Sequence, residues 1–189
     1  AFNHKAHLLA NIEALRLAFD LSAQQRPPTP DETTLLKRYG GFGAIKAILL
    51  EPNDPAAWTT TLDLQLKAPI AELHRLLAEQ AGDRAGEYLS GLKNNVLSGF
   101  YTPPEIVLSV GQALRETLGE QPLRMLDPSA GTGQFLSHFK AAGLRLSEVQ
   151  LIEKDPATAL ILSALYGQEQ VENKGFEECG RRFNERFDL

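Results

Sequence analysis

The chain has 189 residues, enough to bury a hydrophobic core and to build one domain with an appendage. Its hydrophobic content of 43% and charged content of 23% are ordinary for a globular protein. It contains no signal-peptide pattern and no apolar run of about 18 residues, so we expect a cytoplasmic protein with no membrane partner.

The single cysteine, Cys179, excludes an internal disulfide and a cysteine-based zinc cluster. The net charge of −5 disfavours a broad nucleic-acid-binding surface, because phosphate contacts require a basic face. A basic surface for DNA would therefore be local or lie outside this chain.

The N-terminal stretch predicts a helix from about Asn3 to Ser22. Apolar side chains follow helical spacing on one face, at Leu8, Ile12, Leu15 and Phe19. His4 and His7 are close enough along this helix to share a metal ion, but a third ligand is missing nearby. We interpret them as surface histidines and expect no metal site.

A second helix is predicted to begin after the break at Gln24–Pro28. Thr29 has the type and position of an N-cap, Pro30 follows at the first helical position, and Glu32 completes a capping box.

The segment Lys37–Gly43 places glycines around Phe42, next to two cations. It either contacts nucleic acid or a partner, or forms a corner where helices pack closely, and its composition favours the corner. Further helices are predicted at about Pro69–Gln80 and Asp83–Leu97, after a loop at Glu51–Thr61. Residues 1–97 are therefore expected to form a helical domain.

An α/β domain is predicted from Ser98 onward. Thr102–Glu105 has the pattern of a second capping box, opening a helix that ends before Gly119. Its expected buried face consists of Ile106, Val107, Val110, Leu114 and Leu118.

The next stretch predicts a strand, a glycine turn and a helix. The apolar run Leu123–Leu126 has the length of a buried strand, and helical spacing resumes after Gly133 until Gly143. Gly131 and Gly133 allow a sharp turn and the close approach of a ligand, and the following helix offers free N–H groups. This order is the first half of a nucleotide-binding βαβ unit.

The turn lacks the features of two common phosphate-binding loops. Gln134 stands where a Walker loop has its lysine, and Leu136 stands where a dinucleotide fingerprint has a third small residue. The acidic Asp127 at the strand end suits a cationic or amino-bearing ligand better than a pyrophosphate. S-adenosylmethionine, a sulfonium with an α-amino group, meets that preference.

A second strand is predicted to end at Glu153, which lies 26 residues after Asp127 (153 − 127). A carboxylate at this strand end accepts hydrogen bonds from ribose hydroxyls in dinucleotide-binding folds. Asp155 is expected to cap a helix over Pro156–Tyr166, and a third strand is expected at about Gln170–Phe176.

Asp127–Leu136 resembles motif I of the S-adenosylmethionine-dependent N6-adenine DNA methyltransferases. Gly99–Val107 resembles motif X, which precedes motif I in the subclass that includes type I modification subunits of restriction-modification systems. Arg26–Glu32 and Tyr39–Gly43 also resemble the start of phage and mobile-element proteins that join an adenine methyltransferase to a helicase.

The resemblance implies S-adenosylmethionine as the cofactor and a truncated Rossmann-like sheet as the fold of residues 98–189. The residues it implies for cofactor binding are Tyr101, Thr102, Pro103, Asp127, Ser129, Ala130, Gly131, Gly133, Glu153 and Phe176. Motif III of the family has an acid before its aromatic residue, but Gly175 stands there, and Glu177 is the nearest substitute. Phe176 either stacks on the adenine or packs in the core.

Phe187–Leu189 is similar to the start of the family's fourth strand, which leads into an Asn/Asp-Pro-Pro-Tyr/Phe motif that holds the flipped adenine. That tetrapeptide, motif IV, does not occur in these residues, so no catalytic residue is assigned and the chain alone is expected to be inactive.

We therefore interpret the chain as an α/β protein, with a helical N-terminal domain followed by a truncated Rossmann-like S-adenosylmethionine-binding sheet. It would be the N-terminal part of a DNA adenine-N6 methyltransferase whose full-length form binds DNA. The alternatives are a methyltransferase for RNA or protein, and a non-catalytic module that recruits DNA or a partner. The sheet edge is expected to self-associate or to leave the last residues loosely held, with Arg181, Arg182 and Arg186 opposing close contact between copies.

Overall fold

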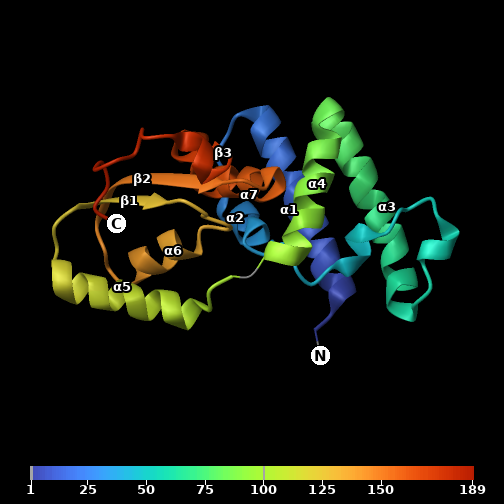
Figure 1. The fold of residues 1–189 in the computed structure, drawn as a ribbon, viewed down its shortest axis with the longest axis horizontal. Helices are drawn as coiled ribbons and strands as arrows, with labels where there is room; N and C mark the ends of the chain where they lie inside the picture. The colour runs from blue at the N-terminus through green and yellow to red at the C-terminus, as the bar shows by residue number, and fades with distance from the viewer. Residues whose placement is uncertain (1, 100) are drawn as a thin grey trace.

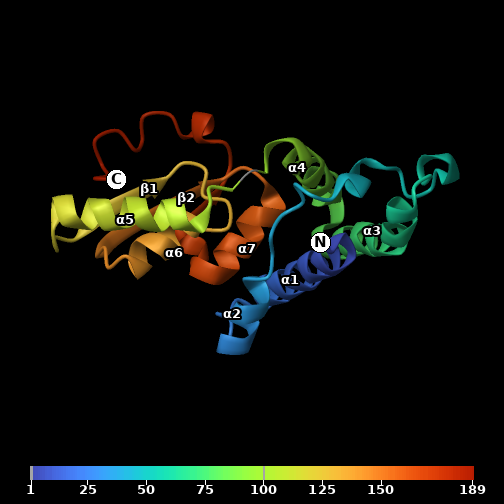
Figure 2. The same cartoon turned by 90° about the horizontal axis from the view of Figure 1, so that it is seen from below.

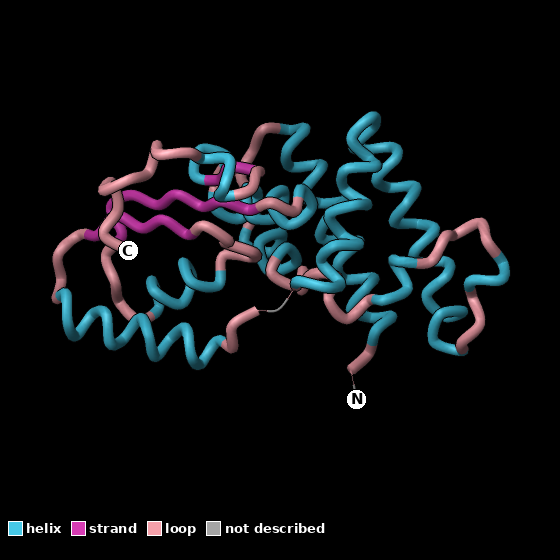
Figure 3. Tube along the Cα trace, viewed as in Figure 1, coloured by secondary structure: helices cyan, strands magenta, loops and turns pink. Residues whose placement is uncertain are grey.

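The sheet lies at one end of the molecule and most of the N-terminal helical segment lies at the other (Figure 1). A computed structural model describes residues 2–99 and 101–189. Figure 3 shows that helices make up most of the described chain and that the strands run side by side in a small sheet. The chain is therefore a mixed α/β protein with a large helical part.

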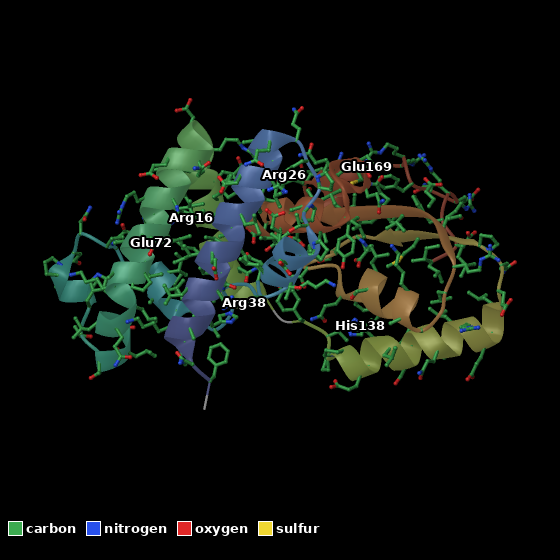
Figure 4. All side chains as sticks on the ribbon, turned by 180° about the vertical axis from the view of Figure 1, so that it is seen from behind. Arg16, Arg26, Arg38, Glu72, His138 and Glu169 are labelled. Atoms are coloured by element: carbon green, nitrogen blue, oxygen red, sulfur yellow. The ribbon has the colours of Figure 1, made fainter. Side chains whose placement is uncertain are left out.

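The first part of the chain is helical, as the sequence predicts. Its α-helices are α1 (His4–Gln24), α2 (Pro30–Leu36), α3 (Thr61–Ala81) and α4 (Ala85–Ser98), with short 3-10 helices at Lys46–Leu49, Pro55–Ala57 and Gly82–Arg84. The side chain of Asn3 caps α1, and both hydrogen bonds of the predicted Thr29–Glu32 capping box are formed at α2. From behind, Arg16 of α1 and Glu72 of α3 point toward each other (Figure 4) and form a 3.0 Å ion pair.

The predicted start of α3 at Pro69 is wrong, because the helix begins at Thr61. Thr60 caps it by accepting a 3.1 Å hydrogen bond from the backbone N–H of Asp63. Leu66 and Ile70 share the buried face, so burial on both sides of Pro69 carries the helix through a residue that lacks an N–H donor.

The Tyr39–Gly43 corner is buried between helices. Tyr39 and Phe42 are 4% and 0% exposed. The side chain of Asn11 donates to the carbonyl oxygen of Gly41 at 2.7 Å and accepts from the N–H of Gly40 at 3.0 Å. The packing of this corner agrees with the helix-corner interpretation of its glycines.

The two histidine rings of α1 both pack against Phe2, with ring centroids 4.8 Å from it for His4 and 5.0 Å for His7. A ring nitrogen of His7 also lies 2.9 Å from the carbonyl oxygen of Gly41.

The second part of the chain builds a parallel sheet in the order β1-β2-β3. Its strands are β1 (Leu123–Asp127), β2 (Leu146–Glu153) and β3 (Val171–Asn173), and its helices are α5 (Pro104–Leu118), α6 (Gln134–Ala141) and α7 (Pro156–Tyr166), with 3-10 helices at Gln168–Gln170 and Phe176–Cys179. The capping of α7 by Asp155 and its end at Gly167 are confirmed.

The two faces of the sheet have different covers. Figure 2 shows α5 and α6 alongside β1 and β2, and Met125 and Leu151 pack there against Val107 of α5 and Leu136 of α6. Ile152 points to the opposite face, where it packs against side chains from the segment after β3. Alternate side chains of β1 and β2 therefore pack on opposite faces of the sheet, one face against α5 and α6 and the other against the segment after β3.

Helix α7 joins the two parts of the molecule. Ala157 and Ile161 belong to the same buried core as α1, α3 and α4, whereas Leu162 packs into the core beneath the sheet. The expected boundary near residue 97 separates the helical and sheet segments in sequence, but the hydrophobic packing continues across it.

The predicted capping box at Thr102 does not form. Pro103 is the N-cap of α5, without a side-chain hydrogen bond, because the helix begins at Pro104 and Thr102 lies one residue too early. The predicted buried face is also partly wrong, since Ile106 and Val110 are 54% and 43% exposed.

A different face of α5 is buried from the one predicted, because α5 packs against α6. Val107 and Gly111 form the buried side, and Leu114 and Leu118 pack beside them. A Cβ at Gly111 would lie 3.0 Å from a ring carbon of Phe139 in α6, so the missing side chain brings these helices together.

The third strand is shorter than predicted. β3 ends at Asn173, whose side chain donates hydrogen bonds to the carbonyl oxygens of Glu153 and Lys154 at 2.9 and 3.1 Å. A longer β3 would have no strand to pair with, because β2 ends at Glu153, the partner of Asn173. Phe176 consequently begins a 3-10 helix instead of ending a strand.

The last residues pair with the edge of β1 opposite β2. The N–H of Leu126 donates to the carbonyl oxygen of Leu189 at 2.9 Å, and the N–H of Leu189 donates to that of Arg124 at 3.1 Å. This alternation is the pattern of parallel neighbours and agrees with the strand start expected at Phe187–Leu189. Self-association through the sheet edge stays a prediction.

Candidate functional site

A cavity of about 570 Å³ lies at the carboxyl ends of the strands. Its walls are the loop after β1, the turn before α5, the end of β2 and one side of α4. Figure 1 shows β2 directed toward α4 and α7. Open parallel sheets bind ligands at this end of their strands.

The loop after β1 has the backbone that its glycines predict. Gly131 and Gly133 have φ values of +55° and +78°, which disfavour other residues. The N–H of Ala130 donates to the carbonyl oxygen of Ile152 at 2.9 Å, which fixes the loop to β2. A Cβ at Gly133 would lie 2.4 Å from the ring of Tyr166, so α7 packs directly behind the loop.

Glu153 connects the end of β2 to this loop. Its carboxylate accepts hydrogen bonds from the N–H of Gly131 and from the N–H of Asp155, each at 2.8 Å. Burial raises the pKa of Glu153, and these two bonds oppose the rise. Each oxygen keeps acceptor capacity for a ligand hydroxyl.

Tyr101 lies between the loop and the Tyr39–Gly43 corner. A Cβ at Gly131 would lie 2.9 Å from its ring, and a Cβ at Gly41 would lie 2.8 Å from its hydroxyl oxygen. Burial, followed by the nearby charge of Glu153, raises the pKa of Tyr101 to about 12. Phe100, which belongs to the motif X-like stretch Gly99–Val107, lies outside the described residues.

Two acceptor atoms near the loop are buried without a hydrogen-bond partner, Oδ2 of Asp127 and Oε1 of Gln134. Asp127 is 8% exposed, and burial raises the pKa of its carboxyl group. Its other oxygen accepts from the N–H of Ser129 at 3.2 Å. Gln134 lines the cavity, whereas Asp127 does not.

Asp155 links the cavity to the helical corner. Its carboxylate accepts from the backbone N–H groups of Ala157 and Thr158 and from the Thr158 hydroxyl. The Thr158 hydroxyl lies 3.2 Å from that of Tyr39. Burial raises the pKa of Asp155, and these hydrogen bonds oppose the rise.

The structure brings together most of the predicted cofactor residues. Those that line the cavity are Tyr101, Thr102, Ser129, Ala130, Gly131 and Glu153. Asp127 and Gly133 belong to the same loop but do not line the cavity, and Pro103 is exposed outside the lining.

Phe176 does not line the cavity. Its side chain is 45% exposed, so the core-packing alternative is wrong, and its stacking role stays a prediction without support from its position. The neighbouring Glu177 forms a 2.7 Å ion pair with Lys154.

Sequence reasoning missed the wall that α4 contributes. Glu87, Ser90, Gly91 and Asn95 line the cavity from this helix. The only sequence signal was Gly91, a glycine inside a helical pattern, which often marks a close contact.

A larger cavity of about 700 Å³ lies elsewhere, between the C-terminal ends of α1 and α7. Arg26 and Glu169, which line it, are seen on the same side of the molecule in Figure 4. The guanidinium of Arg26 binds both carboxylate oxygens of Glu32. This cavity contains none of the predicted site residues.

Within residues 2–99 and 101–189, no cluster of three or more His, Cys, Asp or Glu side chains is arranged to hold a metal ion. In the same described ranges, we find no helix with the length and apolar character needed to cross a membrane.

Comparison with known proteins gives no relative: no family model matches the chain, and neither a curated protein nor a solved structure shows significant similarity to it.

Proposed function

We propose that the chain binds S-adenosylmethionine in the cavity between the 127–133 loop and α4, as part of a DNA adenine-N6 methyltransferase. The observation that carries this proposal is the position of Glu153. It ends β2 beside the cavity and is hydrogen-bonded to Gly131 of the glycine loop. A carboxylate in this place can bind a ribose while the loop holds the adjoining part of the ligand.

The chemistry of the cavity fits this ligand. Glu153 and Asp155 supply carboxylates to the wall, and Gln134 supplies a buried oxygen without a partner. The cation of the wall, Lys154, is paired with Glu177. These groups favour an ammonium-bearing, hydroxyl-bearing ligand over a triphosphate.

The bound ligand would supply a methyl group on a positively charged sulfur. The contribution of this chain is to hold the ligand. Glu153 would orient the ribose through hydrogen bonds, while the ring of Tyr101, close to Gly131, would border the opposite side of the site. Positioning of this kind supplies much of the rate in a group transfer.

The DNA substrate is proposed from the resemblance of motifs X and I. The chain lacks an Asn/Asp-Pro-Pro-Tyr/Phe segment to hold a flipped adenine. We therefore expect no transfer of labelled methyl groups from S-adenosylmethionine to duplex DNA by this chain alone. Incorporation above a protein-free control would contradict that expectation.

Calorimetry tests the cofactor assignment. We expect S-adenosylmethionine and S-adenosylhomocysteine to bind, and adenosine triphosphate to bind far more weakly. Glu153→Ala should weaken binding by about 1–3 kcal/mol, roughly 5- to 150-fold, because ribose hydroxyls lose their acceptor.

Glu116→Ala is the matched control, since it removes an exposed carboxylate of α5 that does not line the cavity. Equal affinity of the wild type and Glu153→Ala, or tighter binding of the triphosphate, would refute the assignment.

A further inference from the structure

Helix α4 lies close to the start of α7 at the cavity wall, because Gly91 has no side chain to hold the two helices apart. A Cβ at this position would lie 2.5 Å from Oδ1 of Asp155 and 2.9 Å from the ring of Pro156. The backbone of α4 therefore packs directly on the N-terminus of α7. Neighbouring polar side chains of α4 are brought to the end of β2.

The order of residues along α4 gives the cavity two ends. Asn95 lies at the Tyr101 end, where it accepts a 2.9 Å hydrogen bond from the N–H of Phe42. Glu87 and Ser90 lie on the other side of Gly91, and at about 1.5 Å per residue Glu87 is roughly 12 Å from Asn95 along the helix. The proposed ribose position at Glu153 lies between these ends, since its carboxylate binds the N–H of Asp155.

The segment after β3 offers no polar side chain to this cavity. Gly175 has none, and neither Phe176 nor Glu177 lines the wall. Any hydrogen bond to the far end of the ligand must therefore come from another element, and α4 provides candidates.

Glu87 and Ser90 are three residues apart, so both side chains are on one side of the helix. The guanidinium of Arg84 holds the Glu87 carboxylate through hydrogen bonds of 2.8 and 3.0 Å, which leaves acceptor positions on both oxygens. The Ser90 hydroxyl can donate or accept. A carboxylate next to a hydroxyl matches the adenine edge, which presents an amino donor beside a ring-nitrogen acceptor.

We propose that Glu87 and Ser90 of α4 read the adenine of the ligand, with Glu87 accepting from the amino group and Ser90 donating to the adjacent ring nitrogen. This inference rests on the proposed function and deepens it. It assigns base recognition to the helical part of the chain, whereas the glycine loop and Glu153 hold the remainder of the ligand.

The test compares two ligands that differ only in the base edge, S-adenosylhomocysteine and S-inosylhomocysteine. In the second, a carbonyl oxygen replaces the amino group and the ring nitrogen carries a proton, so both hydrogen-bond directions are reversed. The wild type should prefer the adenine form by roughly 5- to 150-fold, the range of a good two-point base contact.

Glu87→Gln should largely abolish this preference, because an amide can donate to the carbonyl oxygen as well as accept from an amino group. Ser90→Ala should weaken both ligands and leave the ratio close to that of the wild type, because a hydroxyl can donate to the adenine nitrogen or accept from the protonated nitrogen of the inosine form. Glu116→Gln, at an exposed carboxylate of α5, is the matched control, and Glu177→Gln tests the segment after β3. Both variants should keep the wild-type ratio, since neither residue lines the cavity. A fold defect would weaken both ligands equally and leave the ratio unchanged.

An unchanged ratio in Glu87→Gln with binding retained, or wild-type affinity for both ligands in Ser90→Ala, would overturn the α4 assignment alone. Loss of preference in Glu177→Gln would move base recognition to the segment after β3 and also overturn it. If the wild type bound neither ligand, the proposed function itself would fail and this inference with it.

Discussion

The carboxylate of Glu153 and the backbone N–H of Gly131 are joined by a 2.8 Å hydrogen bond. The bond connects the end of β2 to the glycine loop after β1, across 22 positions in the chain. The predicted ribose ligand is therefore also a structural support of the loop, and its two roles can be separated by experiment.

Glu153→Ala should lower the free energy of unfolding by about 1–3 kcal/mol, because the N–H groups of Gly131 and Asp155 lose their acceptor. Glu153→Gln should cost less, since its amide oxygen can still accept from one of them. Urea unfolding in the absence of ligand measures both effects. Glu177→Ala, at an exposed ion pair, should stay within about 0.5 kcal/mol of the wild type, and a similar result for Glu153→Ala would contradict the supporting role.

Substituting alanine for each of two glycines of α4 should change the stability of the protein in different directions. Gly91→Ala should destabilise the protein by about 1–3 kcal/mol, because the added methyl group meets Asp155 and Pro156. At Gly86 a Cβ meets nothing within 4 Å, so Gly86→Ala should be neutral or stabilise by up to about 1 kcal/mol. Thermal unfolding of the two variants compares them directly, and stabilisation by both would show that α4 does not pack tightly on α7.

We expect the buried side chain of Asn11 to stabilise the folded protein through its hydrogen bonds to the backbone of Gly40 and Gly41. Asn11 is 0% exposed, and its amide satisfies one donor and one acceptor of that backbone. Asn11→Ala should cost about 1–3 kcal/mol, because the N–H of Gly40 loses its acceptor, whereas the carbonyl oxygen of Gly41 keeps the His7 ring nitrogen at 2.9 Å. Chemical unfolding measures the loss, with the exposed Gln112→Ala as a control expected to stay within about 0.5 kcal/mol.

Asn11→Asp separates hydrogen bonding from side-chain volume. The carboxylate keeps the size of the amide and can accept from the N–H of Gly40, but it cannot donate to the carbonyl oxygen of Gly41. We expect Asn11→Asp to be destabilised as well. Wild-type stability of this variant would show that volume alone matters at the corner.

The capping box of α2 should weaken in acid. The Arg26 guanidinium, followed by the N–H of Thr29, lowers the pKa of Glu32 from 4.5 to about 2. Since the folded-state pKa is the lower one, the stabilisation by ionised Glu32 is complete above pH 4.5 and is lost as the pH falls toward about 2. The stability difference between the wild type and Glu32→Gln should shrink over that window.

Nuclear magnetic resonance titration of the Glu32 carboxyl carbon measures this pKa directly. In Arg26→Gln, the titration should move back toward 4.5, because the first cause of the shift is removed. A wild-type midpoint near 4.5 would contradict the bidentate pairing of Arg26 with Glu32.

The sequence by itself determined the local features of this protein. The caps at Thr29 and Asp155 and the turn at Gly131–Gly133 follow their predicted positions. These features depend on hydrogen bonds between residues a few positions apart, or on the backbone freedom of one residue type, so short patterns encode them. The placement of Glu153 near the glycine loop follows as well, because the carboxyl ends of adjacent parallel strands meet at one edge of the sheet.

Only the tertiary structure decided which surfaces these elements share. The exposed face of α5 depends on its packing with α6, and the length of β3 depends on where its partner β2 ends. The α4 wall of the cavity depends on a contact between Gly91 and Asp155, which are far apart in the chain. Such contacts arise from shape and burial between distant segments, and apolar spacing within one helix does not specify its neighbour.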